Sequence, residues 1–121
     1  MSISILAVDD SRTMRDMISR ALGEAGFSVS TAEDGAHGLE VLSGLKPNVI
    51  ITDINMPRLD GFGFIEGVRA SGSHRGIPIL VLTTESGAEL KSRAKAAGAT
   101  GWIVKPFDRE KLVAAIRRVA V

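Results

Sequence analysis

The chain has 121 residues, 45% of them hydrophobic and 24% charged, which predicts one globular domain over residues 1–121 and excludes a disordered chain. Residues 1–90 carry seven basic and twelve acidic side chains, and residues 91–121 carry eight basic and two acidic ones, which excludes a uniformly basic nucleic-acid binder. No cysteine is present, and paired acids follow the first apolar run too early for a signal peptide or a membrane span, so we expect a cytoplasmic protein without membrane contact.

Short apolar runs alternate with amphipathic stretches along the whole chain, and this pattern predicts strands followed by helices. In chain order, the expected elements are strand 3–8, helix 11–22, strand 27–31, a helix that Asp34 caps and that continues through Leu42, strand 49–52, helix 62–70, strand 79–82, helix 87–97, strand 102–104 and helix 109–120 after the cap Asp108. Three strands hold the uninterrupted apolar runs ILAV, VIIT and ILVL, which are typical of strands buried on both faces, whereas 27–31 alternates like an edge strand.

This alternation predicts an α/β fold in which a parallel sheet carries helices on both faces. Five strands are too few for an eight-stranded barrel, so we expect an open sheet that binds ligands at the carboxyl ends of its strands. Polar side chains follow those ends, namely Asp9, Asp10, Asp53, Thr83 and Lys105. Because all strands of a parallel sheet end at one edge, these side chains are expected to converge.

Such a gathering of charges predicts a particular chemistry. Three carboxylates in one crevice repel one another unless a pKa rises or a cation binds, and Mg²⁺ suits open loop positions because it keeps several waters and recruits a phosphate. Asp53 could then be a nucleophile that forms an aspartyl phosphate. Lys105 and Thr83 would contact the oxygens of the transferring phosphoryl group.

Four motifs, VDDSRTMR, IITDINMPRLDG, LTT and GWIVKPF, carry a resemblance that covers essentially the whole chain. Together they resemble the receiver domain of two-component response regulators. The resemblance implies a flavodoxin-like open five-stranded parallel sheet with the strand order 2-1-3-4-5, an order for which the chemotaxis member of this family is a known example. It also implies a monomer that takes a phosphoryl group from a histidine kinase onto Asp53 and loses it slowly, rather than an enzyme with a separate substrate.

Individual roles follow from the resemblance at the matching positions. The residues that would hold Mg²⁺ are Asp9, Asp10, Asp53 and, through its backbone carbonyl, Asn55. Thr83 would move its hydroxyl onto the phosphoryl group, and Lys105 would pair with that group. The Lys105–Pro106 bond would be a cis peptide.

Trp102 occupies the position of the aromatic switch residue, where tyrosine or phenylalanine is more usual. Thr84 follows the switch hydroxyl, where a smaller residue is common. Elsewhere, we interpret Met14 and Met17 as core residues at helical spacing, and His37 and His74 as solvated side chains.

Several functions stay open beside this interpretation. SRTMR resembles the chemotaxis subgroup, which implies a flagellar motor switch protein as the target, whereas a relay or phosphate-sink receiver would serve another pathway. An aspartate-nucleophile phosphatase would carry a general-acid aspartate where this chain has Asn55. In a flavin-binding electron carrier, Asp9 and Asp10 would repel the flavin phosphate.

Basic residues near the C-terminus predict a partner face on the fourth helix, the fifth strand and the fifth helix. The residues expected on this face are Lys91, Lys95, Trp102 and Lys111. The three lysines belong to a wider basic set that is composed of Lys91, Arg93, Lys95, Arg109, Lys111, Arg117 and Arg118. An acidic partner segment should therefore associate faster at low salt.

Overall fold

The computed structural model describes residues 3–120, in which strands and helices alternate. In chain order the elements are β1 (Ser4–Val8), α1 (Arg12–Glu24), β2 (Ser28–Ala32), α2 (Gly35–Ser43), β3 (Val49–Thr52), α3 (Gly61–Ala70), β4 (Ile79–Thr83), α4 (Ala88–Ala97), β5 (Gly101–Val104) and α5 (Arg109–Val119). All strand pairs are parallel, and the strands lie in the order β2-β1-β3-β4-β5. The predicted α/β fold is confirmed, including its strand order.

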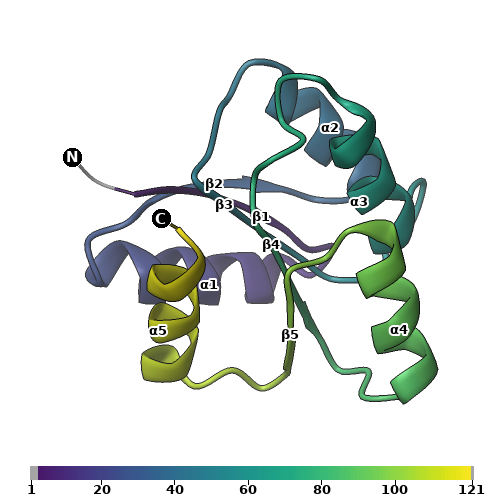
Figure 1. Ribbon diagram of the computed structural model, residues 1–121. Helices are drawn as coiled ribbons and strands as arrows, with labels where there is room; N and C mark the ends of the chain where they lie inside the picture. Colours follow the sequence, from purple (N-terminus) through teal and green to yellow (C-terminus); the bar gives the residue numbers. More distant parts are fainter. Residues whose placement is uncertain (1–2, 121) are drawn as a thin grey trace.

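The sheet lies between two layers of helices, with α1 and α5 on one face and α2, α3 and α4 on the other (Figure 1). All residues of β3 and β4 are buried, and β1 is buried after its first residue. β2 is only partly buried because it forms one edge of the sheet. The uninterrupted apolar runs are therefore the central strands, and the polar residues that follow them stand at one edge of the sheet.

Most helices begin at a side-chain cap. The residues Ser11, Asp34, Asp60 and Asp108 each accept a hydrogen bond from a backbone N–H in the first turn of the helix that follows. The helix α4 starts at Gly87 without such a bond, and Ala94 is its one buried residue. Within residues 3–120, no helix combines the length and the apolar character that crossing a bilayer requires.

Two side chains differ from their sequence predictions. His74 is buried rather than solvated, and its Nε2 lies 2.9 Å from the carbonyl oxygen of Leu45, in the loop before β3. Met17 is 48% exposed rather than part of the core, because α1 turns Ile18 and Leu22 toward the sheet. The burial of His74 depends on a loop that lies 29 residues away, so its polar neighbours in sequence gave no indication of it.

Candidate functional site

The carboxyl ends of β1 and β3 bring three carboxylates together. The backbone N–H of Asp53 donates to the carbonyl of Val8 at 3.0 Å, which places Asp53 directly beside the end of β1. One carboxylate oxygen from each of Asp9, Asp10 and Asp53 lies within 4.8 Å of the others. Asp9 and Asp53 are buried and Asp10 is exposed, so the cluster has one side open to solvent.

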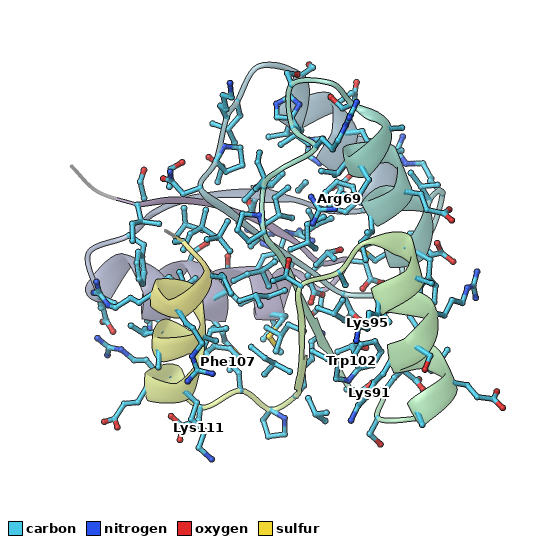
Figure 2. All side chains as sticks on the ribbon, in the orientation of Figure 1. Arg69, Lys91, Lys95, Trp102, Phe107 and Lys111 are labelled. Carbon is cyan, nitrogen blue, oxygen red and sulfur yellow. The ribbon has the colours of Figure 1, made fainter. Side chains whose placement is uncertain are left out.

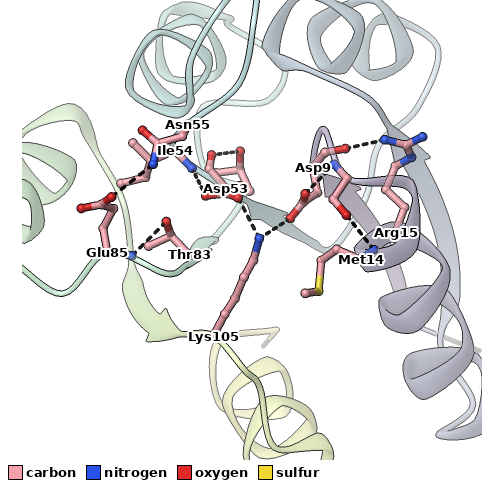
Figure 3. A network of polar contacts seen from close by, with 11 residues as sticks. Asp9, Met14, Arg15, Asp53, Ile54, Asn55, Thr83, Glu85 and Lys105 are labelled. Atoms are coloured by element: carbon pink, nitrogen blue, oxygen red, sulfur yellow. Dashed lines mark hydrogen bonds and ion pairs between the residues drawn. The ribbon is translucent and has the colours of Figure 1, made fainter.

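Lys105 crosses the site from the end of β5 and joins two of these carboxylates (Figure 3). Its Nζ donates to Asp9 Oδ2 at 2.8 Å and to Asp53 Oδ2 at 2.7 Å. Burial opposes the charged form of the lysine, but the hydrogen bonds and the charge attraction to Asp53 and Asp9 together outweigh it and raise the pKa of Lys105. The lysine is therefore a fixed positive charge between the two carboxylates, and the peptide bond that follows it, Lys105–Pro106, is cis.

Asp9 is held on several sides. Its Oδ1 accepts the backbone N–H of Ser11 at 2.9 Å, and its carbonyl oxygen accepts Arg15 Nη1 at 2.7 Å. Burial raises the pKa of the Asp9 carboxyl, although hydrogen bonds from Lys105 and Ser11 partly oppose that effect. A cation next to this carboxylate would favour its ionised form.

The loop after β3 wraps closely around Asp53. The Oδ1 of Asp53 accepts the backbone N–H of Ile54 at 2.6 Å, while Oδ2 faces Lys105. Gly61 begins α3 directly over this turn, and a Cβ atom there would overlap the carbonyl oxygen of Asp53. Glycine at position 61 is therefore what lets the loop close on the buried carboxylate.

Glu85, which was not predicted to belong to the site, contacts three residues that were: Thr83, Trp102 and Asn55. Its backbone N–H donates to Thr83 Oγ1 at 3.4 Å, and its carbonyl oxygen accepts Trp102 Nε1 at 3.0 Å. Its carboxylate lies 3.4 Å from Asn55 Nδ2. Thr83, Trp102 and Asn55 therefore meet through one residue of the β4–α4 loop, and the position of Glu85 two residues after Thr83 was its only signal in the sequence.

The donor set fits a hard divalent cation. The cluster offers only carboxylate oxygens, which are the ligands that Mg²⁺ prefers over sulfur or nitrogen. Three ionised carboxylates beside one ammonium group leave two negative charges to be balanced, so a divalent ion would neutralise the site.

The β5 edge of the sheet carries a second feature, a surface pocket of about 270 Å³ against α4. Lys91, Lys95 and Trp102 line it together with the small residues Ala94 and Gly101, and Figure 2 shows the two lysines beside the indole. Lys111 lies on α5, outside the set that lines this pocket. Three of the four residues predicted for the partner face therefore surround one hollow.

Sequence comparison explains why these features occur together. The family model for the response regulator receiver domain matches residues 5–117. The chain belongs to this family. A receiver domain implies a histidine kinase as phosphodonor and a downstream target.

Solved structures of receiver domains share this fold closely. The Vibrio cholerae chemotaxis protein CheY4 is 45% identical with a TM-score of 0.94, over 98% of this chain and 99% of that one. The receiver domain of the Pseudomonas aeruginosa sensor histidine kinase PA1611 is 26% identical with a TM-score of 0.92, over 99% and 98% of the two chains. The PA1611 structure contains a magnesium ion coordinated in its active site cleft.

The receiver domain is also similar to longer proteins. The response regulator MprA of Mycobacterium tuberculosis is 38% identical over 117 residues, and so is MprA of Mycobacterium bovis. These matches cover 97% of this chain, which spans only half the length of the MprA proteins.

Proposed function

We propose that this receiver domain is a phosphorylation-controlled switch in which Asp53 accepts a phosphoryl group from a histidine kinase. The bridge from Lys105 Nζ to both Asp9 and Asp53 carries this proposal. An Asp53 carboxylate oxygen attacks phosphorus, the bond from phosphorus to the donor histidine nitrogen breaks, and that nitrogen keeps the electron pair and takes up a proton. The product is an acyl phosphate on Asp53.

The chain's own residues have defined parts in this transfer. The ligands of Mg²⁺ would be Asp9, Asp10, Asp53 and the backbone carbonyl of Asn55. The ion supplies positive charge for the phosphoryl oxygens. Lys105 orients the Asp53 carboxylate before transfer and pairs with the new phosphoryl group afterwards. Thr83, now hydrogen-bonded to Glu85 at 3.4 Å, would turn its hydroxyl toward that group.

Labelling with a small phosphodonor tests this proposal. Acetyl phosphate with Mg²⁺ should label the native protein, and an acyl phosphate should be lost from it in alkali. The Asp53→Asn variant should stay unlabelled, and the native protein should stay unlabelled in EDTA. A label that resists alkali, or one that persists in the variant, would contradict phosphorylation of Asp53.

We further propose that the output is a protein contact in chemotaxis, with a flagellar motor switch protein as the target. The similarity to CheY4 and the SRTMR motif support this choice. The contact would use the pocket at Lys91, Lys95 and Trp102, together with Lys111 on α5. Because Trp102 donates to Glu85 in the loop that follows Thr83, beryllofluoride with Mg²⁺ should change the emission of this single tryptophan.

Binding assays with the beryllofluoride form distinguish the chemotaxis role from a relay or phosphate sink in the cytoplasm. Beryllofluoride should increase affinity for a motor switch protein about 5- to 150-fold if that protein is the target. Exchange of phosphate with a histidine phosphotransfer protein, without any gain in motor switch affinity, would favour the relay. Multiple turnover of a phosphomonoester would instead indicate a phosphatase, for which Asn55 lacks the carboxyl group of a general acid.

A further inference from the structure

The loop between Asp53 and α3 is tied to a part of the molecule that lies outside the carboxylate cluster. Arg58, in this loop, donates from Nε to Asp34 Oδ2 at 2.8 Å and from Nη2 to Asp34 Oδ1 at 3.0 Å. The same Oδ1 accepts the backbone N–H of His37 at 2.8 Å and so caps α2. This two-bond ion pair connects the phosphoacceptor loop to the first turn of α2.

The backbone reinforces the same connection. The N–H of Gly35 donates to the carbonyl of Leu59 at 3.0 Å, and a Cβ atom on Gly35 would overlap that oxygen. Arg58 has a φ of 64°, in the left-handed region that favours glycine. A residue with a side chain is strained in this conformation, and the bidentate pair with Asp34 is a contact that compensates for the strain.

Asn55 stands between two anchors of this loop. On one side the N–H of Gly61 donates to the carbonyl of Ile54 at 2.8 Å and closes the loop at its base. On the other side Arg58 is fixed to Asp34, three residues beyond Asn55. Loss of the outer anchor would loosen the segment that carries the Asn55 carbonyl, while the carboxylates of Asp9 and Asp53 would stay in place at the ends of their strands.

We propose that Asp34 and Arg58 are positioning residues that fix the Asn55 carbonyl for the cation bound beside Asp53. The inference rests on the proposed function, because it assigns a role in the same site. Neither side chain belongs to the carboxylate cluster, so both act through the loop. An outer contact that orients a ligand in this way commonly changes metal affinity about 10- to 100-fold when it is removed.

Thermal unfolding with and without Mg²⁺ tests this proposal, because a ligand raises the melting temperature according to its affinity for the folded state. Arg58→Gly removes the guanidinium and also relieves the left-handed backbone, so the variant should fold. Asp34→Asn keeps a good cap but loses the charge. Arg58→Lys keeps the charge without the two-bond geometry. The matched control is Arg109→Ala, which breaks the exposed Arg109–Glu24 pair on α5 and α1.

We expect Arg58→Gly and Asp34→Asn to reduce the Mg²⁺-dependent rise in melting temperature by an amount that corresponds to about tenfold weaker affinity. The Mg²⁺-dependent rise of Arg58→Lys should be intermediate between that of these two variants and that of the native protein. Arg109→Ala should show the same rise as the native protein. A role in stability alone would lower the melting temperature equally with and without Mg²⁺, and that result would overturn the inference. If the native protein itself shows no rise with Mg²⁺ and no label from acetyl phosphate, the proposed function fails together with the inference.

Discussion

At the scale of single residues, the positive charge of one ammonium group compensates the negative charges of two buried carboxylates. Asp9 is 1% exposed and Asp53 is 8% exposed, and the Oδ2 atom of each accepts a hydrogen bond from Lys105. Removing one partner of a buried pair leaves the other charge uncompensated, which costs more than the pair itself contributes. The lysine therefore stabilises the protein whenever no cation is bound.

Replacing Lys105 with methionine measures how much this compensation of charge contributes to stability. We expect Lys105→Met to lower the free energy of unfolding by about 1–3 kcal/mol in EDTA at neutral pH, because two carboxylates lose their counter-charge. Mg²⁺ should restore part of that loss in urea titrations. Lys111→Met on the exposed face of α5 is the control and should stay within about 0.5 kcal/mol of the native protein. Equal losses with and without Mg²⁺ would argue against competition between the lysine and the cation.

Asp34 predicts a pH dependence of stability. The hydrogen bonds from Arg58 hold the pKa of this carboxyl below its ordinary value of 3.8. Its ionised form therefore stabilises the fold above pH 3.8, and this contribution is lost as the pH falls through the lower folded-state pKa. The gap in melting temperature between the native protein and Asp34→Asn should be full at pH 7 and should narrow below pH 3.8. A gap that is constant with pH would show that the charge of Asp34 is unimportant.

At the scale of elements, the helices are set by local sequence and the loops by contacts between distant segments. Caps and apolar runs predicted the elements because both signals lie within a few neighbouring residues. The convergence of Asp9, Asp53 and Lys105 was predictable because each follows a strand, and all strands of a parallel sheet end at the same edge. The pair between Asp34 and Arg58 spans 24 residues, and no local pattern marks such a contact. The contacts of Glu85 were missed for the same reason.

Substitution by alanine should change the stability of the protein in opposite directions at two glycines in different helices. At Gly61 the added methyl group would meet the backbone of Asp53 and Ile54, which cannot move aside, so Gly61→Ala should cost more than about 2 kcal/mol. At Gly23, near the end of α1, nothing lies within 4 Å, and Gly23→Ala should stabilise the protein by up to about 1 kcal/mol. Denaturant titrations of both variants test this pair. A neutral Gly61→Ala would mean that the β3–α3 loop can relax away from Asp53.

At the scale of the whole molecule, several basic residues of the C-terminal part also make contacts within the chain. Arg93 lies over the ring of Phe62 at 4.0 Å, Arg117 over that of Phe27 at 5.0 Å, and Arg109 pairs with Glu24. These three arginines are exposed and also make contacts within the chain, so a partner that bound them would compete with those contacts. Lys91 and Lys95 remain exposed beside the pocket at Trp102.

Reversing the charges beside this pocket tests the partner face. Lys91→Glu with Lys95→Glu should slow association with an acidic target segment and remove most of its dependence on salt, because complementary charge acts mainly on the association rate. The same reversals at Arg117 and Arg118 on α5 should have a smaller effect. Stopped-flow association at several salt concentrations measures both pairs. Equal rates for native and reversed proteins would exclude the pocket as the contact.

The position of Lys105, directly after the last strand, has a consequence for synthesis on the ribosome. This lysine reaches Asp9 across 96 residues of sequence and Asp53 across 52, so its ammonium group arrives only after β5 has docked against β4. A nascent chain that exposes Asp53 but has not yet released β5 has no counter-charge for it. If Asp53 is the phosphoacceptor that we propose, a nascent chain completes this site only after β5 has left the ribosome and paired with β4.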